Sequence, residues 1–340
     1  MWGNMDTFPL SVQTTYQDLL EAHRQQAVSN LGGTPVLKEK SGRKYWYVRK
    51  RLGNRIVERY LGPQSAELDQ RIEAGRDAAT DHAVFEKRCA SMVAQLRAAG
   101  LPALDRQTGK VLRAMAVAGA FRLGGTLIGT HAFRLYSAEL GVRFPPELGL
   151  TADVDVAAFE NLKLAIDDKP DPSLARTFAD LGLHPVSEAG DSRKHTRWRM
   201  PGDGLMVEFL VPRMQSHQDV VSLAPLGVDA RALSYLNYLI AEPVQAVGLY
   251  RSGVLIQVPR VERYAIHKLI VASQRRKESA AKARKDLAQA DLLIRILEED
   301  RPEELGLAYE DACARGAKWR SAMDASLDRL PEARARLTFC

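Results

Sequence analysis

Two aspartates separated by one residue, Asp153 and Asp155, lie in a segment where acidic and apolar residues alternate, residues 152–157. Side chains two apart in a strand point to the same side, so both carboxylates are expected on one face, with Val154 and Val156 in the core. Neighbouring carboxylates repel each other unless a cation or a proton lies between them. An all-oxygen pair suits magnesium, which binds a few carboxylates together with water and phosphate oxygens. The pair therefore predicts a site for Mg2+, or for Mn2+ in its place.

A Gly-Thr pair precedes the aspartates. Gly129 and Thr130 follow a short apolar run, residues 126–128, that is typical of a buried strand, and residues 131–140 have the apolar spacing of a helix. Glycine lets the backbone approach a phosphate closely, and the first amides of a helix offer donors and a positive partial charge. Such a turn beside paired carboxylates is the minimal set for phosphoryl or nucleotidyl transfer, which depends on positioning and charge neutralisation.

A third carboxylate, Glu208, lies inside an apolar segment that is predicted to be another strand, residues 205–211. An acid among apolar neighbours is costly to bury without a cation or a partner. Glu208 is therefore the predicted third metal ligand. The alternative is that it pairs with an arginine or lies on a solvated face, because structural ion pairs often produce such positions.

The order of these motifs resembles that of the DNA polymerase beta-type nucleotidyltransferase superfamily. More narrowly, the segments LIGTHAFRLYSAELGVR, TADVDVA and ERYAIHKLIVASQRR…KARKDLAQADLL are similar to a bacterial nucleotidyltransferase-fold family. That family is distantly related to the abortive-infection nucleotidyltransferase toxins. The resemblance covers about residues 110–300, with its separate motifs in the expected order.

The resemblance implies a role for each matched residue. Gly129 and Thr130 would form the phosphate-binding turn, and Asp153, Asp155 and Glu208 would hold the metal. The chain departs from the family pattern in three ways. Thr stands where Ser or Gly is usual, Glu replaces the commoner Asp as the third acid, and the spacing between turn and aspartates is longer.

A helical lysine after the core can reach the triphosphate in related nucleotidyltransferases, and the resemblance implies this role for Lys268. The alternative is an ordinary solvated lysine at the edge of an amphipathic face. Farther along, Lys285 and Asp286 could form an internal ion pair, while Arg275 and Arg276 could contact an RNA backbone.

The segment from Lys38 to Arg59 is strongly basic. It contains nine basic residues against two acidic ones, an excess greater than the formal net charge of +6 for the whole chain. Such a local excess favours a polyanionic partner, with a solvated basic face as the alternative. Aromatic residues alternate with the charges and could stack on bases, or they could form the small core of the segment's own sheet. The candidate acceptor-binding residues are Arg49, Arg51, Arg275, Arg276 and Lys285, and the aromatic set is Tyr45, Trp46, Tyr47 and Tyr60.

Four segments are expected to position these residues. We predict an N-terminal segment with a basic β-hairpin module, a helical linker, a nucleotidyltransferase core and a helical C-terminal region, over residues 1–63, 64–110, 111–260 and 261–340. The fold class is therefore α/β (α+β), with a mixed sheet in the core. No apolar run approaches the 18 residues of a membrane helix, so a cytoplasmic protein is expected. The three cysteines are far apart, which argues against a disulfide framework or a zinc site.

The predicted reaction is transfer of a nucleoside monophosphate from a nucleoside triphosphate to an acceptor hydroxyl, with release of pyrophosphate. The basic segments favour RNA as the acceptor, with transfer RNA as one candidate, and a protein hydroxyl comes second. The rival interpretation is a non-catalytic nucleic-acid-binding or regulatory protein on the same scaffold, because a fold does not determine a function.

Overall fold

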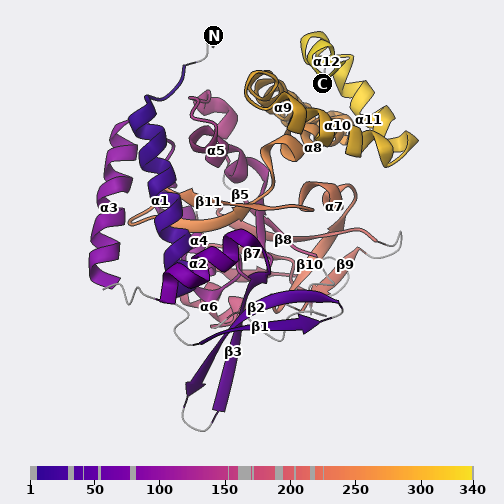
Figure 1. Cartoon of the computed structure of the whole chain (residues 1–340). Coiled ribbons are helices and arrows are strands. Elements are labelled where there is room, and N and C mark those ends of the chain that lie inside the picture. Colours follow the sequence, from indigo (N-terminus) through magenta and orange to yellow (C-terminus); the bar gives the residue numbers. More distant parts are fainter. Residues whose placement is uncertain are drawn as a thin grey trace.

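The computed structural model describes residues 6–29, 34–40, 42–52, 55–76, 82–151, 153–159, 170, 172–187, 194–202, 204–214, 219–224 and 226–338. It confirms the mixed α/β class, with helices arranged around three sheets (Figure 1). Every helix in these ranges is too short or too polar to cross a membrane.

The largest sheet carries the predicted carboxylates. Its strands are β4 (Thr126–Ile128), β5 (Asp153–Ala157), β6 (His184–Val186), β7 (Arg197–Arg199), β8 (Met206–Pro212), β9 (Val220–Leu223) and β10 (Val228–Leu233). The main path runs β4-β5-β8-β10-β9. β5, β8 and β10 are parallel, whereas β4 and β9 are antiparallel to their neighbours at the two ends. The antiparallel pair β6 and β7 extends the sheet beside the first half of β8.

Alternation of side chains decides which face of this sheet is buried. Val154 and Val156 of β5 and Val207 and Phe209 of β8 have no exposed surface. Each such residue stabilises the fold by about 1.5–3 kcal/mol relative to an exposed position. Their burial turns the alternate residues of both strands, which include the acids, toward the other face.

Helices pack on the central sheet. The ring of Phe178, from α6 (Leu174–Asp180), lies 5.9 Å from the ring of Phe209 between centroids. α4 (Arg106–Ala118) packs on α6, and Asp105 caps its first amides. α5 (Gly129–Glu139) leaves the end of β4 directly and packs on β4 and β5.

A hairpin and a helical region follow the central sheet along the chain. They consist of α7 (Leu236–Leu239), the hairpin of β11 (Val244–Gly248) and β12 (Val254–Val258), and then α8 (Val261–Gln274), α9 (Ala280–Asp300), α10 (Pro302–Ala314), α11 (Ala317–Leu327) and α12 (Pro331–Thr338). A helical C-terminal region was predicted from the sequence. α8 packs on α9, α10 and α11, and so connects the helical region with the sheet (Figure 1).

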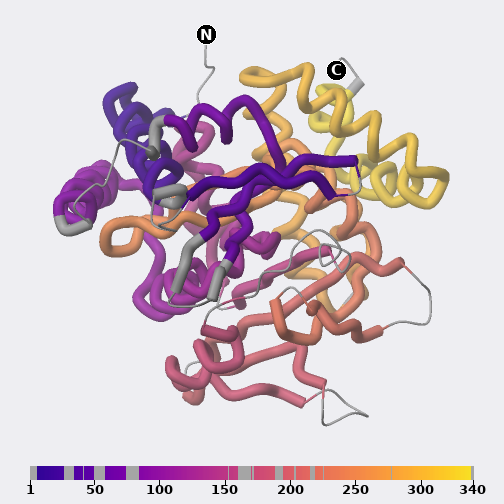
Figure 2. Tube along the Cα trace, turned by 60° about the horizontal axis from the view of Figure 1, so that its bottom comes forward, coloured from indigo at the N-terminus to yellow at the C-terminus, as the bar shows by residue number. Residues whose placement is uncertain are grey.

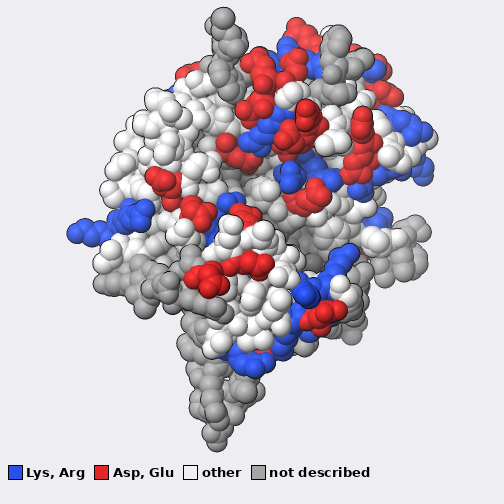
Figure 3. Space-filling view, viewed as in Figure 1, with Lys and Arg blue, Asp and Glu red and all other residues white. Residues whose placement is uncertain are grey.

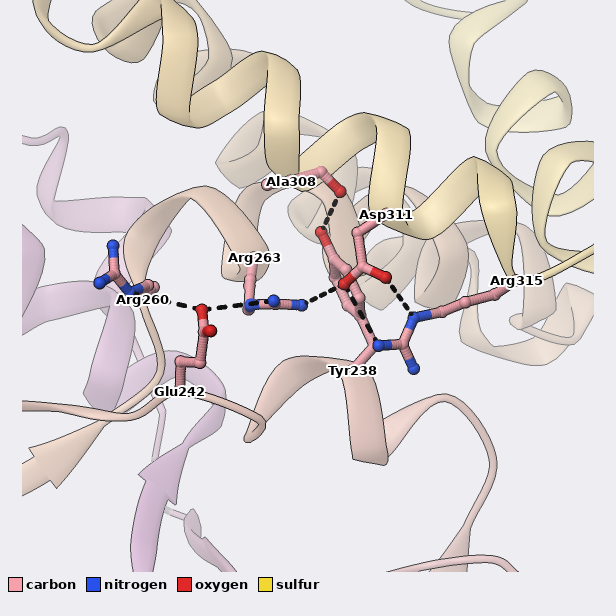
Figure 4. Close-up of polar contacts among 7 residues, drawn as sticks. All are labelled: Tyr238, Glu242, Arg260, Arg263, Ala308, Asp311 and Arg315. Carbon is pink, nitrogen blue, oxygen red and sulfur yellow. Dashed lines mark hydrogen bonds and ion pairs between the residues drawn. The ribbon is translucent and has the colours of Figure 1, made fainter. Parts of the chain in front are cut away.

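A polar network fixes α10 to α7 and α8. The hydroxyl of Tyr238 in α7 donates to the carbonyl of Ala308 at 2.7 Å. Arg263 of α8 lies 2.6 Å from Asp311 of α10 and 3.3 Å from Glu242 (Figure 4). The contact of Tyr238 joins α7 to α10 and the ion pair of Arg263 with Asp311 joins α8 to α10, so together they hold α10 against the two other helices.

The N-terminal helix packs on the β11–β12 hairpin. α1 (Leu10–Ser29) and α3 (His82–Ala98) form a second apolar cluster with hairpin residues. The backbone N–H of Val247 donates to the Tyr16 hydroxyl at 3.1 Å, and the His23 ring contacts the Ser252 carbonyl at 2.8 Å. The first helix is therefore an integral part of the fold.

The basic module is a separate three-stranded antiparallel sheet. It consists of β1 (Thr34–Lys40), β2 (Arg43–Leu52) and β3 (Arg55–Pro63), followed by α2 (Ala66–Arg76). Figures 1 and 2 both show these indigo strands outside the central sheet. Tyr47 and Tyr60 are buried in the main apolar core, and Arg122 donates to the Tyr60 carbonyl at 2.7 Å. These two tyrosines therefore have a packing role, but in the main core of the protein and not in a small core of the module's own.

Two buried histidines make the fold sensitive to acid. Burial lowers the pKa of His131, in the first turn of α5, to about 4, and the charge of Arg134 acts in the same direction. Burial and then the charge of Lys268 lower the pKa of His267, in α8, to about 3. Both rings are therefore neutral in the folded protein at pH values where the unfolded chain is protonated.

Because the folded pKa values lie below the ordinary value of 6.5, the unfolded state binds more protons once the pH falls below 6.5. Stability should fall between about pH 6.5 and pH 4, by about 1.4 kcal/mol per pH unit for each histidine. We expect His131→Gln and His267→Gln each to flatten the dependence of the unfolding free energy on pH, measured by urea unfolding. His184→Gln, at an exposed position of β6, is the control and should keep the wild-type slope. Equal slopes in all four proteins would contradict this explanation.

Candidate active site

The predicted turn and two of the predicted acids meet across adjacent strands. Ile128, the last residue of β4, pairs with Asp155 of β5, and Asp155 pairs with Glu208 of β8. Asp153 lies two residues before Asp155 on the same strand and pairs with Met206. Asp155 therefore has the glycine turn on one side and Glu208 on the other.

Gly129 begins α5 in close contact with Asp155. Its φ of +67° lies in the left-handed region that favours glycine, and a Cβ atom at this position would overlap the Asp155 carboxylate. The carbonyl of Gly129 accepts a hydrogen bond from the Tyr264 hydroxyl of α8 at 2.9 Å. Thr130 follows in the first turn and is half-buried. The first amides of α5 therefore start directly beside the acidic pair.

The pKa of Asp155 reflects its burial and the charges around it. Burial raises the pKa of Asp155 to about 6, and the negative charges of Glu208 and Asp153 act in the same direction. Lys268 and Arg231 act in the opposite direction without cancelling the rise. The position of Asp155 therefore favours either a proton or an additional cation.

Glu208 pairs with an arginine that the sequence analysis did not single out. Arg231 Nη2 of β10 lies 2.8 Å from Glu208 Oε1, with 47% of the arginine side chain and 13% of the glutamate side chain exposed. Pairing with an arginine was the alternative for Glu208, and the structure confirms that it occurs. In β10 (VDARAL), buried residues alternate with more exposed ones, and this alternation could have indicated that Arg231 lies on the less buried face of the strand. It could not have indicated the partner of Arg231, which depends on the pairing of β10 with β8.

Lys268 lies close enough to Asp155 to affect its pKa, but its ammonium group has another partner. Lys268 Nζ donates to Asp286 Oδ1 of α9 at 2.6 Å, and the two side chains are 9% and 5% exposed. Arg275 donates to the second oxygen of Asp286 at 2.9 Å. Lys285 instead donates to the carbonyl of Leu150, so the ion pair of Asp286 is with Lys268 and Arg275 and not with Lys285.

The remaining candidate residues lie in other parts of the chain. Arg49 of β2 pairs with Glu58 at 2.9 Å, and the side chain of Arg51 lies outside the described part of the structure. Arg276 is exposed in the connection between α8 and α9. Figure 1 shows the module at the lower end of the molecule and α9 at the upper end. The candidate acceptor-binding residues therefore lie in two places. Arg275, Arg276 and Lys285 lie between α8 and α9 or in α9, whereas Arg49 lies in the module.

The donor chemistry fits a divalent cation, but the side chains do not form a complete set of ligands. Asp153 and Asp155 offer carboxylate oxygens from one strand, and burial, followed by the negative charges of Glu208 and Asp153, raises the pKa of Asp155. Across the described ranges, His, Cys, Asp and Glu form no group of three that could hold a metal ion. Glu208, the third predicted ligand, is paired with Arg231.

The comparison with protein families decides the classification. Residues 106–314 match a family model described as Nucleotidyltransferase, which covers more than half of the chain. The chain belongs to this nucleotidyltransferase family. Residues 14–70 match a second model, a domain of unknown function (DUF6788). No curated protein matches the sequence.

The nucleotidyltransferase match spans the central sheet and α8 and α9. It includes the glycine turn, all three acids, Arg231, Lys268 and Asp286. Membership supports a transferase with a nucleotide substrate. The match to DUF6788 spans the basic module and most of α1, and it assigns no activity to them.

The close contact between Gly129 and Asp155 can be tested by measuring protein stability, without an activity assay. Gly129→Ala should lose about 1–2 kcal/mol because of its positive φ, and a further 1–3 kcal/mol because of the overlap with Asp155. Gly182→Ala is the matched control, since Gly182 has a φ of +80° but open space around its Cβ position. Replacing Asp155 with Ala in the Gly129→Ala protein should recover the excess loss. Calorimetric unfolding measures all of these variants, and equal losses for both glycines would contradict the proposed contact.

Proposed function

We propose that this nucleotidyltransferase family member is a metal-dependent enzyme that moves a nucleoside monophosphate from a nucleoside triphosphate to an acceptor hydroxyl. One observation carries the proposal. The glycine turn at the start of α5 lies against Asp155, which pairs with Glu208 and shares its strand with Asp153. Amide donors for phosphate and oxygen ligands for Mg2+ or Mn2+ therefore occur side by side, within the segment that matches the family.

The residues of the chain have separable tasks in this reaction. Asp153 and Asp155 would hold the cation, which when bound supplies charge neutralisation for the phosphoryl group. The first amides of α5 would bind phosphate oxygens, and Gly129 lets the phosphate approach the backbone. Tyr264 holds the turn through the Gly129 carbonyl and would keep those amides in place. The ammonium group of Lys268 is paired with Asp286, so Lys268 would act on the site through its charge and not by direct contact with the triphosphate.

RNA is the acceptor that the charge distribution supports best, and a protein hydroxyl is the second acceptor class. The exposed cations of the module include Arg43, Lys44 and Arg49. Figure 3 shows mainly basic side chains with some acidic ones over β1 and β2, and a mixture of acidic and basic side chains over the C-terminal helices. Because Tyr47 and Tyr60 are buried in the core, the module would contact phosphates more than bases.

The rival function, a non-catalytic nucleic-acid-binding or regulatory protein, draws support from the pairing of Glu208 with Arg231. A catalytic test separates the two. The protein is incubated with each labelled ribonucleoside triphosphate, a divalent cation and total cellular RNA, and the products are resolved on a gel. Label on RNA in the presence of Mg2+ or Mn2+ supports the enzyme with an RNA acceptor. Label on protein alone supports the second acceptor class, and no transfer to either acceptor favours the rival.

Asp153→Ala and Asp155→Ala should each abolish transfer while the protein stays folded. Removing one of two neighbouring carboxylates removes repulsion, so no large loss of stability is expected. Transfer is measured with the labelled triphosphate assay, and folding by circular dichroism and thermal unfolding. Asp219→Ala is a control, because Asp219 is an exposed acid in an ion pair with Arg213. Full turnover by folded Asp155→Ala protein would exclude the proposed site.

Neutralising the module should weaken RNA binding without affecting triphosphate binding. Deletion of residues 1–63 is unsuitable, because it removes α1, Tyr47 and Tyr60 from the packed structure. Arg43→Gln with Lys44→Gln changes two exposed side chains instead. The log–log salt dependence of RNA affinity should become shallower by about 0.7 for each phosphate of the single strand that the variant no longer neutralises.

The matched control for the module changes one arginine and one lysine at another exposed place. Lys318→Gln with Arg320→Gln alters α11 and should leave the RNA affinity and its salt dependence at wild-type values. Fluorescence anisotropy with a labelled single-stranded RNA measures both quantities. Equal salt dependence in the module variant and in the wild type would show that the module does not bind the RNA backbone.

A further inference from the structure

The cations around the candidate site differ sharply in their surroundings. Lys268 is buried and bound to Asp286, which also binds Arg275. Arg231 reaches the same acidic group from β10, with 47% of its side chain exposed and Glu208 as its ion-pair partner. Breaking a buried pair costs several kcal/mol, whereas an exposed pair contributes about 0–1 kcal/mol. Of these two site cations, Arg231 is the one that can change partners at little cost.

We propose that Arg231 is a phosphate-binding residue that Glu208 holds in the absence of metal and releases when a divalent cation binds to Glu208. This inference rests on the proposed function, and it adds a substrate-binding residue to that site. A guanidinium group presents several donors in a planar fork that matches two phosphate oxygens. The triphosphate is the polyanion that this site would receive.

The geometry makes Arg231 and a cation at Asp155 compete for the charge of Glu208. Arg231 Nη2 lies 2.8 Å from Oε1, one of the two oxygens that a metal ion could use. Strand β8 lies between β5 and β10, so Glu208 has Asp155 on one side and Arg231 on the other, and a cation shared with Asp155 would weaken the attraction of Glu208 for the guanidinium. Two ligands that compete for one group weaken each other's binding by the same factor.

The exchange predicts that Arg231 affects the binding of the cation and the binding of the triphosphate in opposite directions. Without nucleotide, Arg231 competes with the cation and lowers the affinity for metal. Once metal is bound, the guanidinium of Arg231 is free to bind the negatively charged triphosphate. Charge-assisted hydrogen bonds to phosphate contribute about 1.5–3 kcal/mol to such binding. Metal binding should therefore precede and strengthen triphosphate binding through this residue.

The test compares two binding affinities of the full-length Arg231→Met protein with those of the wild type. This variant keeps most of the apolar stem of the side chain and removes the guanidinium group with its charge. Binding of Mn2+ alone is measured by electron paramagnetic resonance. Binding of the four α,β-methylene ribonucleoside triphosphates at saturating Mg2+ is measured by titration calorimetry. We expect the affinity for Mn2+ to rise by up to about fivefold, and the affinity for the bound analogue to fall by about tenfold or more.

Two further variants make the result specific. Arg231→Lys should give smaller changes of the same signs, because it keeps the charge and loses the fork. It also provides the measurement if Arg231→Met fails to fold. Arg260→Met is the matched control, since the Arg260 side chain is likewise 47% exposed and lies 3.7 Å from Glu242. Both affinities of this control should equal those of the wild type.

The outcomes separate this inference from the proposed function. If the wild type binds Mn2+ and an analogue but Arg231→Met changes neither affinity, or changes both in one direction, the role of Arg231 is wrong and the proposed function stands. If the wild type binds neither Mn2+ nor any analogue, both are wrong. Opposite changes in the two affinities support the exchange, because a purely structural residue would not produce them.

Discussion

The contact between Gly129 and the Asp155 carboxylate is the constraint on which the candidate site depends. A side chain at position 129 would displace the carboxylate, and a φ of +67° is strained for other residues. Strand β4 must therefore end just before Gly129, and α5 must begin at it, for the turn and the acid to lie side by side. The antiparallel pairing of β4 with β5 sets the register that brings them together. One glycine thus couples the local backbone of the turn to the placement of the charge.

Several acids buried close together require positive charge to balance them. The structure provides this charge in two ion pairs that differ in how strongly they are buried. Lys268, whose charge acts on Asp155, forms a buried pair with Asp286, and Arg275 binds the second oxygen of Asp286. This arrangement is costly to disrupt, so it supplies a fixed potential. In the pair of Arg231 with Glu208 the arginine side chain is half-exposed, so Arg231 can leave its partner at a smaller cost than the buried Lys268 can. Fixed and exchangeable positive charge therefore lie on different elements, α8 and β10.

Local patterns in the sequence were sufficient to predict the elements that carry the site. The apolar run before Gly129, the helix after it and the alternation around Asp155 were all predicted close to their observed positions, because each depends on short-range periodicity. The partners of the charged residues could not be predicted in this way. Arg231 contacts Glu208 only because β10 pairs with β8 in parallel, and Tyr264 reaches the Gly129 carbonyl only because α8 packs there. Such contacts depend on tertiary arrangement, for which a single sequence carries no periodic signal.

Helix α8 connects the candidate site with the rest of the molecule. Its Tyr264 holds the glycine turn and its Lys268 lies next to the carboxylates, while Arg263 on the same helix pairs with Asp311 of α10 (Figure 4). A helix is stiff along its length, so these three contacts cannot shift independently. The C-terminal helices therefore do more than cover apolar surface, because their packing sets the position of α8 and through it the turn. This dependence gives a physical reason why the family match extends beyond the sheet into the helices, to residue 314.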